Sequence, residues 1–317
     1  MGWNTILNRT LSNDVELLNQ LNNIPESKSA FVRNSDGTLS GYISMISCSA
    51  NQAYCMSVRI DQSIGGKFIS IEPTDDSDTF QITDVQDEAE DMSLQPIFIQ
   101  VFHNPNGRLA LQHLVDQAAE RILGRINLDM KKNVTVDLTD SDDLNVWRDK
   151  AGFVIRDKMK LCELTVNKNE FQKTLETAEN IKISEFDGSQ MEKIVRFDKA
   201  VSSGDRSTFL KYLFKDANVL TAESEEISAV AGYGVFCEDR ILAVYAESKQ
   251  IAHAIMQEIL RKINYDEVTL CTMQNHWSVE SKPIIHCRQI TRLHTRALPT
   301  GIMWDRIFVL NLGMNLI

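Results

Sequence analysis

Residues 97–138 read IFIQVFHNPNGRLALQHLVDQAAERILGRINLDMKKNVTVDL, and three patterns within this stretch decide the fold. The first six residues are mostly aromatic and β-branched, which predicts a strand. Apolar side chains then recur with the helical period at positions 111, 114, 115, 118, 122 and 126. Residues 133–138 are rich in β-branched side chains and predict a second strand. A strand, a helix and a strand in this order predict a βαβ unit with parallel pairing.

Further elements are expected on either side of this unit. Residues 15–21 predict a helix, and strands follow over residues 30–33 and 41–48. After the second strand of the unit, residues 142–150 predict a short helix. Gly152 stands where a helix-terminating glycine is expected.

The second half of the chain repeats this order of patterns. Residues 241–246 and 268–272 predict two strands, and Ser248 is placed to cap a helix between them. The apolar positions of that helix are 251, 252, 255, 259, 260 and 263. The elements expected upstream are a helix over residues 191–214 and strands over residues 219–222 and 230–236.

The repeat predicts two domains of one fold class. Residues 168–180 are polar and carry no apolar stripe of two helical turns, so we place the boundary near residue 178. The domains are then residues 1–178 and 179–317, close to the usual ~150 residues per domain. The expected fold class is α/β with a mixed sheet.

Composition excludes several classes of protein. Hydrophobic residues make up 43% of the chain and charged residues 24%, which suits a protein with a buried core. No apolar run approaches the ~18 residues that span a membrane. The net charge of −11 argues against non-specific nucleic-acid binding and favours cationic partners. The six cysteines are scattered in apolar stretches, as buried free thiols are, which predicts a cytoplasmic protein.

The order of elements resembles the GNAT acyltransferase superfamily in its tandem form, including GNAT-like proteins of nematodes. In that superfamily a strand leads into a Gln/Arg-x-x-Gly-x-Gly/Ala loop and a long helix, which together bind the pyrophosphate of acetyl-CoA. Residues 104–110, NPNGRLA, resemble this loop: Gly107 fits and Arg108 adds positive charge, whereas Asn104 and Leu109 depart from the pattern. Residues 143–153, DLNVWRDKAGF, resemble the fourth helix of the superfamily.

The resemblance extends to the second half of the chain and implies one cofactor site. Arg206, with Asp205 before it, and the run GYG at residues 232–234 resemble a C-terminal GNAT-like domain. The cofactor-binding residues implied in the first half are Val101, Phe102, His103, Asn106, Gly107, Arg108, Leu109 and Ala110. No glycine occurs between residues 235 and 300, so no pyrophosphate loop is expected in the second half.

The activity that the resemblance implies is acyl-CoA-dependent N-acyl transfer, with acetyl-CoA as co-substrate and a small amine or basic peptide as acceptor. The amine attacks the thioester directly, after losing a proton to a base. His103 and Asp137 are candidates for this base; the alternatives are an exposed loop histidine and a carboxylate that caps a turn. The superfamily often has a tyrosine as general acid four residues before the glycine of the fourth helix, and here that residue is Arg148. The alternative function is therefore an inactive GNAT-like binding or regulatory protein.

Two further clusters leave alternatives open. Residues 68–107 contain no Lys or Arg but nine carboxylates, which form either an acidic wall for a cationic acceptor or a solvated loop. The only concentration of Cys and His comprises Cys271, His276, His286, Cys287 and His294. These spacings do not match zinc motifs, so we expect no metal site.

Overall fold

The computed structural model describes residues 24, 26–86, 108–124, 131–139, 142, 144–176, 181–202, 204–224, 229–274, 276–277 and 283–310. Contacts divide these residues into two compact units. The N-terminal unit contains the described residues of Arg9–Thr135 and Asp143–Val154. The C-terminal unit contains those of Val136–Asp142 and Ile155–Ile317.

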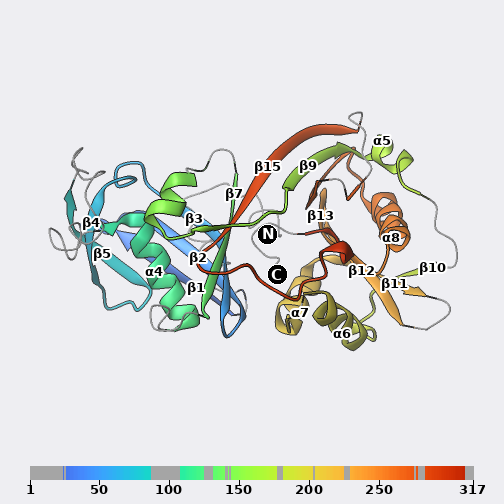
Figure 1. Cartoon of the computed structure of the whole chain (residues 1–317), viewed down its shortest axis with the longest axis horizontal. Coiled ribbons are helices and arrows are strands. Elements are labelled where there is room, and N and C mark those ends of the chain that lie inside the picture. Colours follow the sequence, from blue (N-terminus) through green and yellow to red (C-terminus); the bar gives the residue numbers. More distant parts are fainter. Residues whose placement is uncertain are drawn as a thin grey trace. The chain divides into compact units, whose positions relative to one another are not determined.

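The N-terminal unit is a sheet with one long helix packed against it (Figure 1). Its elements in chain order are β1 (Ser27–Arg33), β2 (Leu39–Ser49), β3 (Gln52–Ile60), β4 (Phe68–Pro73), β5 (Thr79–Gln86), β6 (Arg108–Leu109), α4 (Ala110–Leu123), the start of β7 (Asn133–Thr139) and the π-helix η3 (Val146–Lys150). β1, β2 and β3 form an antiparallel meander. β5 pairs in parallel with β1, and β4 and β6 follow it in the sheet.

Helix α4 covers β1, β2 and β3 because its apolar stripe faces them. Leu111, Leu114, Val115 and Ala118 of this stripe are all buried, as the helical period predicts. The start of β7 lies beside β3, where the Asn133 N–H donates to the Asn51 carbonyl oxygen over 2.8 Å. The described chain therefore passes from β3 through the β4–β5 hairpin and α4 to β7. The expected strand over residues 97–102 lies outside the described residues.

The C-terminal unit is a mixed sheet with helices on both faces (Figure 1). Its elements in chain order are the end of β7, β8 (Ile155–Arg156), β9 (Leu161–Asn167), α5 (Lys168–Lys173), β10 (Ile181–Glu185), α6 (Met191–Ser202), α7 (Ser207–Asp216), β11 (Asn218–Ser224), β12 (Val230–Cys237), β13 (Arg240–Ala246), α8 (Lys249–Lys262), β14 (Glu267–Met273), β15 (Ile284–His294), the 3-10 helix η4 (Trp304–Arg306) and β16 (Ile307–Val309). The strand order is β10-β11-β12-β13-β14-β9-β15, in which β13 and β14 are parallel and the other neighbours antiparallel.

Alternate residues of β12 show how the helices divide between the two faces of this sheet. A Cβ atom on Gly234 would lie 2.5 Å from Ile255 Cγ2, so α8 packs closely on this face. The Tyr233 ring points to the other face, where its centroid lies 6.3 Å from that of Phe197 in α6 and 6.1 Å from that of Phe214 in α7. The GYG run at residues 232–234 therefore lets one helix approach the sheet and buries an aromatic ring beneath two others.

Most of the expected elements are confirmed, and so is the α/β class with a mixed sheet. The strands expected over residues 30–33, 41–48, 133–138, 219–222, 230–236, 241–246 and 268–272 are β1, β2, β7, β11, β12, β13 and β14. The Ser248 side chain accepts the Ile251 N–H and caps α8, as predicted. The helix expected over residues 15–21 lies outside the described residues.

One of the predicted helices needs correction. The single helix expected over residues 191–214 is wrong, because the chain forms α6 and α7 with Gly204 and Asp205 between them. The short helix expected over residues 142–150 is confirmed over residues 144–150, of which Val146–Lys150 is the π-helix η3. Gly152 follows it with φ +80°, a conformation that favours glycine over other residues.

The two units meet in the sequence near residue 155, whereas the polar segment placed a domain boundary near residue 178. The difference concerns β9 and α5, which belong to the C-terminal unit because β9 pairs with both β14 and β15. The boundary near residue 178 stays a prediction. Among the described residues, no helix is long and apolar enough to cross a membrane.

Candidate functional site

The described part of the expected cofactor loop is its end, where α4 begins. Val101, Phe102, His103, Asn106 and Gly107 lie outside the described residues. The remaining three residues of the loop are Arg108, Leu109 and Ala110, of which the first two form β6 and the third opens α4. Leu109 and Ala110 are buried and Arg108 is exposed.

The first turn of α4 has no side-chain cap among the described residues. No described side chain caps its backbone N–H groups, and the N-cap position is Leu109, which has no polar side chain. Instead Gln112 turns back, and its Oε1 accepts the Leu109 N–H over 3.1 Å. The uncapped N–H groups of a first helical turn carry partial positive charge and attract phosphate.

Gln112 also places this helix terminus within the N-terminal unit. Its Nε2 donates to the Lys150 carbonyl oxygen over 2.5 Å, and Lys150 ends η3, which follows the carboxyl end of β7. The start of α4 therefore contacts the end of η3.

Arg108 pairs at the same terminus with Asp116, about two turns further along the chain. Its Nη1 lies 2.6 Å from Asp116 Oδ2, and both side chains are about half exposed. Burial raises the pKa of Asp116, although the Arg108 guanidinium opposes this effect. The guanidinium keeps unused N–H donors, because Arg has five and this pair uses one.

His113 lies one turn into α4 and is a candidate that the sequence patterns missed. Its Nε2 lies 3.0 Å from the Ile69 carbonyl oxygen, so this nitrogen carries the proton and Nδ1 is an acceptor. Burial lowers the pKa of His113, which keeps the ring neutral at pH 7. Its position between apolar helix residues gave no signal in the sequence, because it interrupts no pattern.

The segment that resembles the fourth helix ends in an aromatic contact. The Phe153 N–H donates to the Trp147 carbonyl oxygen over 3.1 Å, and the two rings lie 5.3 Å apart. Arg148, at the position of the expected tyrosine, is exposed and pairs with Asp149 over 2.6 Å. This position therefore offers no phenol to protonate a leaving thiolate.

Asp137, the second candidate base, is fully buried on β7. Its two carboxylate oxygens accept Nε and Nη2 of Arg292, each over 2.7 Å. Both oxygens are engaged in this bidentate pair, which lies within the C-terminal unit. His103, the first candidate, lies outside the described residues, and both assignments stay predictions.

The residues that suggested a C-terminal GNAT-like domain form a buried polar cluster. Arg206 Nε and Tyr233 Oη donate to the Asp198 carboxylate over 3.0 and 2.6 Å, and Arg206 Nη2 binds it too. The guanidinium carbon lies 5.2 Å from the centre of the Tyr245 ring. Burial alone would lower the pKa of Arg206, but Asp198 outweighs this and raises it. The cluster joins α6 and α7 to β12 and β13.

The Cys and His residues of the second half do not converge on one point. Cys271 is buried, whereas Cys287 is exposed on β15, so the expectation that every thiol is buried is wrong for Cys287. Cys162 and Cys287 line a pocket of about 180 Å³ beside β14. Burial and the neighbouring Cys287 raise the pKa of Cys162 to about 12. Among the described residues, no three His, Cys, Asp or Glu side chains are grouped as a metal ion requires.

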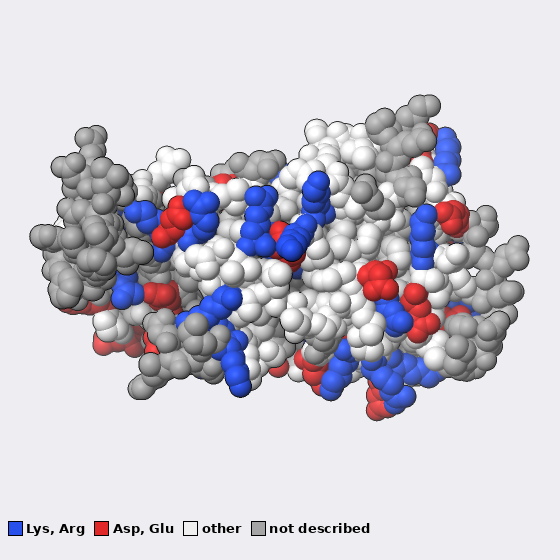
Figure 2. Space-filling view, viewed as in Figure 1, with Lys and Arg blue, Asp and Glu red and all other residues white. Residues whose placement is uncertain are grey.

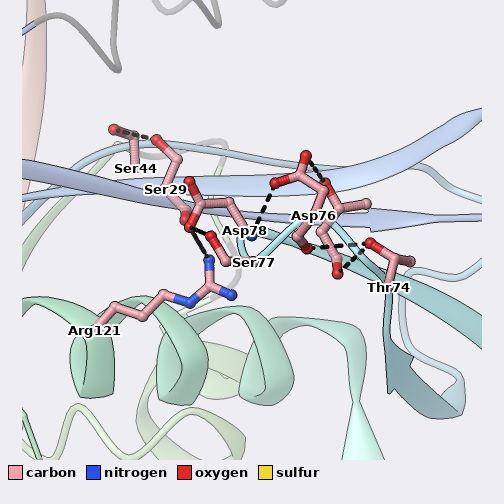
Figure 3. Close-up of polar contacts among 8 residues, drawn as sticks. Ser29, Ser44, Thr74, Asp76, Ser77, Asp78 and Arg121 are labelled. Atoms are coloured by element: carbon pink, nitrogen blue, oxygen red, sulfur yellow. Dashed lines mark hydrogen bonds and ion pairs between the residues drawn. The ribbon is translucent and has the colours of Figure 1, made fainter.

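The described part of the acidic stretch is the β4–β5 hairpin, which is fastened to α4 (Figure 3). Arg121 Nη1 lies 2.7 Å from Asp78 Oδ1 and donates to the Ser29 carbonyl oxygen over 3.1 Å. Asp76 binds its own turn, accepting the Asp78 N–H and the Thr79 hydroxyl. The turn carboxylates therefore have structural partners. On the face in Figure 2, acidic and basic side chains are interspersed in small groups.

A family model described as a domain of unknown function, DUF7596, matches residues 11–155. This range ends where the N-terminal unit ends in the sequence. No curated protein matches the chain.

Several solved structures similar to this chain are described as acetyltransferases or GNAT proteins. A proposed acetyltransferase from Pyrococcus horikoshii is 12% identical with a TM-score of 0.49, covering 88% of this chain and 77% of that one. A GCN5-related N-acetyltransferase from Sphaerobacter thermophilus is 13% identical with a TM-score of 0.47, covering 84% and 81%. A tandem GNAT protein of the clavulanic acid biosynthesis pathway is 9% identical with a TM-score of 0.42, covering 87% and 85%. The tandem arrangement and the resemblance to nematode proteins stay predictions for this chain.

Proposed function

We propose that this protein is an acyl-CoA-dependent N-acyltransferase that transfers an acetyl group from acetyl-CoA to an amine. The observation that carries the proposal is the first turn of α4, which has no side-chain cap and has Arg108 beside it. A pyrophosphate needs these features: backbone N–H groups that no side chain occupies and a cation that can approach it. Gly107 precedes this turn, where close approach of the backbone to an anion favours glycine.

The reaction would proceed by direct attack of the amine on the thioester carbonyl. The new C–N bond forms as the C–S bond breaks, the thiolate of CoA leaves, and the proton of the amine passes to a base. Of the expected bases, Asp137 is occupied by Arg292. We therefore add His113 to His103 as a candidate, because its Nδ1 is a neutral acceptor on α4.

The second candidate function is an inactive GNAT-like binding protein that retains cofactor affinity. The observation that favours it is the ion pair of Arg148 with Asp149, at the position where the superfamily has its tyrosine. The two functions share the cofactor site and differ in turnover alone.

Thermal unfolding with and without acetyl-CoA tests the shared site. At ~100 times its dissociation constant, a bound cofactor stabilises the folded state by ~2.7 kcal/mol. We expect this shift in the parent chain and its loss in Gly107→Glu and Arg108→Glu. Lys211→Glu, an exposed charge reversal in α7, is the matched control and should keep the shift.

The outcomes separate the two functions. A shift in all four proteins would place the cofactor elsewhere, and no shift in the parent would overturn acetyl-CoA binding. Where the shift behaves as expected, release of free thiol in the presence of a panel of amines distinguishes an acyltransferase from a binding protein.

A further inference from the structure

The parallel strands β13 and β14 of the C-terminal unit separate soon after they begin to pair. They are in register at only two positions, Arg240 with Thr269 and Ile241 with Leu270. Beyond these positions their facing backbone groups point into the space between the two strands. Buried N–H and C=O groups must find partners, so an extended segment is needed there.

Strand β16 of the same chain fills this space. It pairs in antiparallel fashion with β13, Val309 beside Val244 and Ile307 beside Tyr245. On its other side, the Leu310 N–H donates to the Cys271 carbonyl oxygen of β14 over 2.8 Å. The segment therefore pairs with the facing edges of both strands.

Side chains of the C-terminal unit also bind β16. The Phe308 carbonyl oxygen accepts the Thr272 hydroxyl over 2.7 Å and the Trp277 indole N–H over 3.1 Å. Residues 307–310 are at most 5% exposed. Val309 and Phe308 belong to the main core cluster of the unit, together with Val244.

We propose that β16 is a built-in substitute for an extended ligand, which closes the C-terminal unit to the amide-bearing arm of an acyl-CoA. Such an arm binds by donating to and accepting from strand backbone groups, as an added strand does. The groups of β13 and β14 that could receive it are already paired with residues 307–310. This inference rests on the proposed function in one respect: it assigns the cofactor to the N-terminal unit alone.

Hydrogen exchange of the full chain tests the closure without relying on cofactor binding. We expect the backbone amides of residues 307–310 to exchange much more slowly than those of an unstructured peptide. Exchange at the rate of an unstructured peptide would overturn the proposal. The exchange measurement remains informative even if acetyl-CoA fails to bind. A failure of this proposal can therefore be distinguished from a failure of the proposed function.

A covalent lock tests whether acetyl-CoA displaces β16. Val244→Cys with Val309→Cys places two thiols at facing positions of an antiparallel pair, a geometry that admits a disulfide. Mild oxidation of the two thiols by a disulfide reagent forms this bond, which peptide mapping verifies, and the same protein after reduction is the matched control. We expect the same Kd for acetyl-CoA in both forms.

The opposite result would show that the ligand enters between the strands. If binding requires β16 to leave, the locked form should show a Kd raised by ~10-fold or more, a loss of ~1.4 kcal/mol. Loss of exchange protection at residues 307–310 on adding acetyl-CoA would point the same way. No binding in either form would refute the proposed function and leave the closure to be judged by the exchange of the unliganded chain.

Discussion

Asp198 accepts hydrogen bonds from Arg206 and Tyr233 in the interior of the C-terminal unit, where its side chain is buried. The side chains of Arg206 and Asp198 are 3% and 1% exposed. A buried pair of this kind contributes little net stability compared with apolar residues. Removing one partner, however, leaves the other charge buried in the core without a counter-charge. The cluster therefore couples the stability of α6, α7 and β12.

Substitution of Asp198 tests this dependence. We expect Asp198→Asn to lower the free energy of unfolding by about 3–5 kcal/mol, because the Arg206 charge stays buried without its counter-charge. Urea denaturation of the full chain measures the change. Asp205→Asn alters an exposed carboxylate and should stay within ~0.5 kcal/mol of the parent. Equal stability of the two variants would contradict a structural role of the cluster.

A second residue-scale prediction concerns His253, which is buried on α8 and stacks on Trp277. Its Nδ1 accepts the Glu176 N–H over 2.8 Å, which requires the neutral ring. Burial lowers the pKa of His253 below its ordinary value of 6.5, so the unfolded chain takes up a proton more readily than the folded one. The free energy of unfolding should therefore fall as the pH drops from ~7 to ~5.

The pH dependence of urea unfolding in His253→Asn checks this prediction. Asparagine keeps an acceptor for the Glu176 N–H but does not titrate, so the fall toward low pH should become shallower. His286→Asn removes an exposed histidine and is the matched control, which should keep the slope of the parent. An unchanged slope in the His253 variant would assign the acid sensitivity to other groups.

Residue-scale predictions from sequence succeeded where a local pattern exists and failed where partners are distant. Ser248 was identified as a cap because cap and helix are adjacent in the chain. Asp137 was considered as a base, yet its partner Arg292 lies 155 residues away, and no spacing reveals such a pair. The loop between residues 103 and 107 stays a prediction.

At the scale of elements, periodicity was sufficient for the long helices and for the strands that flank them. α4 and α8 carry complete apolar stripes, and both are confirmed. For the stretch that contains the β4–β5 hairpin, the sequence indicates either an acidic wall or a solvated loop, because its polar residues hide the short apolar alternation. It is held instead by contacts with α4, such as Arg121 with Asp78. These contacts are tertiary and have no signature in the segment itself.

Packing of α8 on β12 gives an element-scale prediction. We expect Gly234→Ala to lower the free energy of unfolding by ~1–3 kcal/mol, because its methyl group would press on Ile255 and Ile259. Gly65→Ala is the matched control, since a Cβ there would make only ordinary contacts and the backbone needs no positive φ. Chemical denaturation of both variants provides the measurement, and equal stability would mean that α8 shifts freely on the sheet.

At the scale of the whole molecule, the role of β9 decides where an independent domain begins. β9 lies between β14 and β15 in the sheet, although it precedes both by about a hundred residues in the chain. Sequence patterns could not predict this, because they show the type of an element and not its neighbours. The polar segment near residue 178 follows β9 and so separates it from the strands with which it pairs.

Two fragments test the predicted boundary. Residues 179–317 form the domain that the sequence suggests, and residues 131–317 add β7, β8 and β9. We expect only the longer fragment to unfold cooperatively, because the shorter one leaves the facing edges of β14 and β15 without the strand that joins them. Thermal unfolding followed by circular dichroism measures this. Cooperative unfolding of residues 179–317 would instead confirm the boundary near residue 178.

The position of β16 in the sequence has a consequence for synthesis of the protein. A ribosome releases β13, α8 and β14 before it adds residues 307–310, and at ~5–20 residues per second the interval from Ala246 to Ile307 takes several seconds. During that time the nascent sheet exposes unpaired backbone edges and an apolar core. Such edges are templates for pairing with other chains. We therefore expect chaperones to bind the nascent C-terminal unit until β16 has been synthesised.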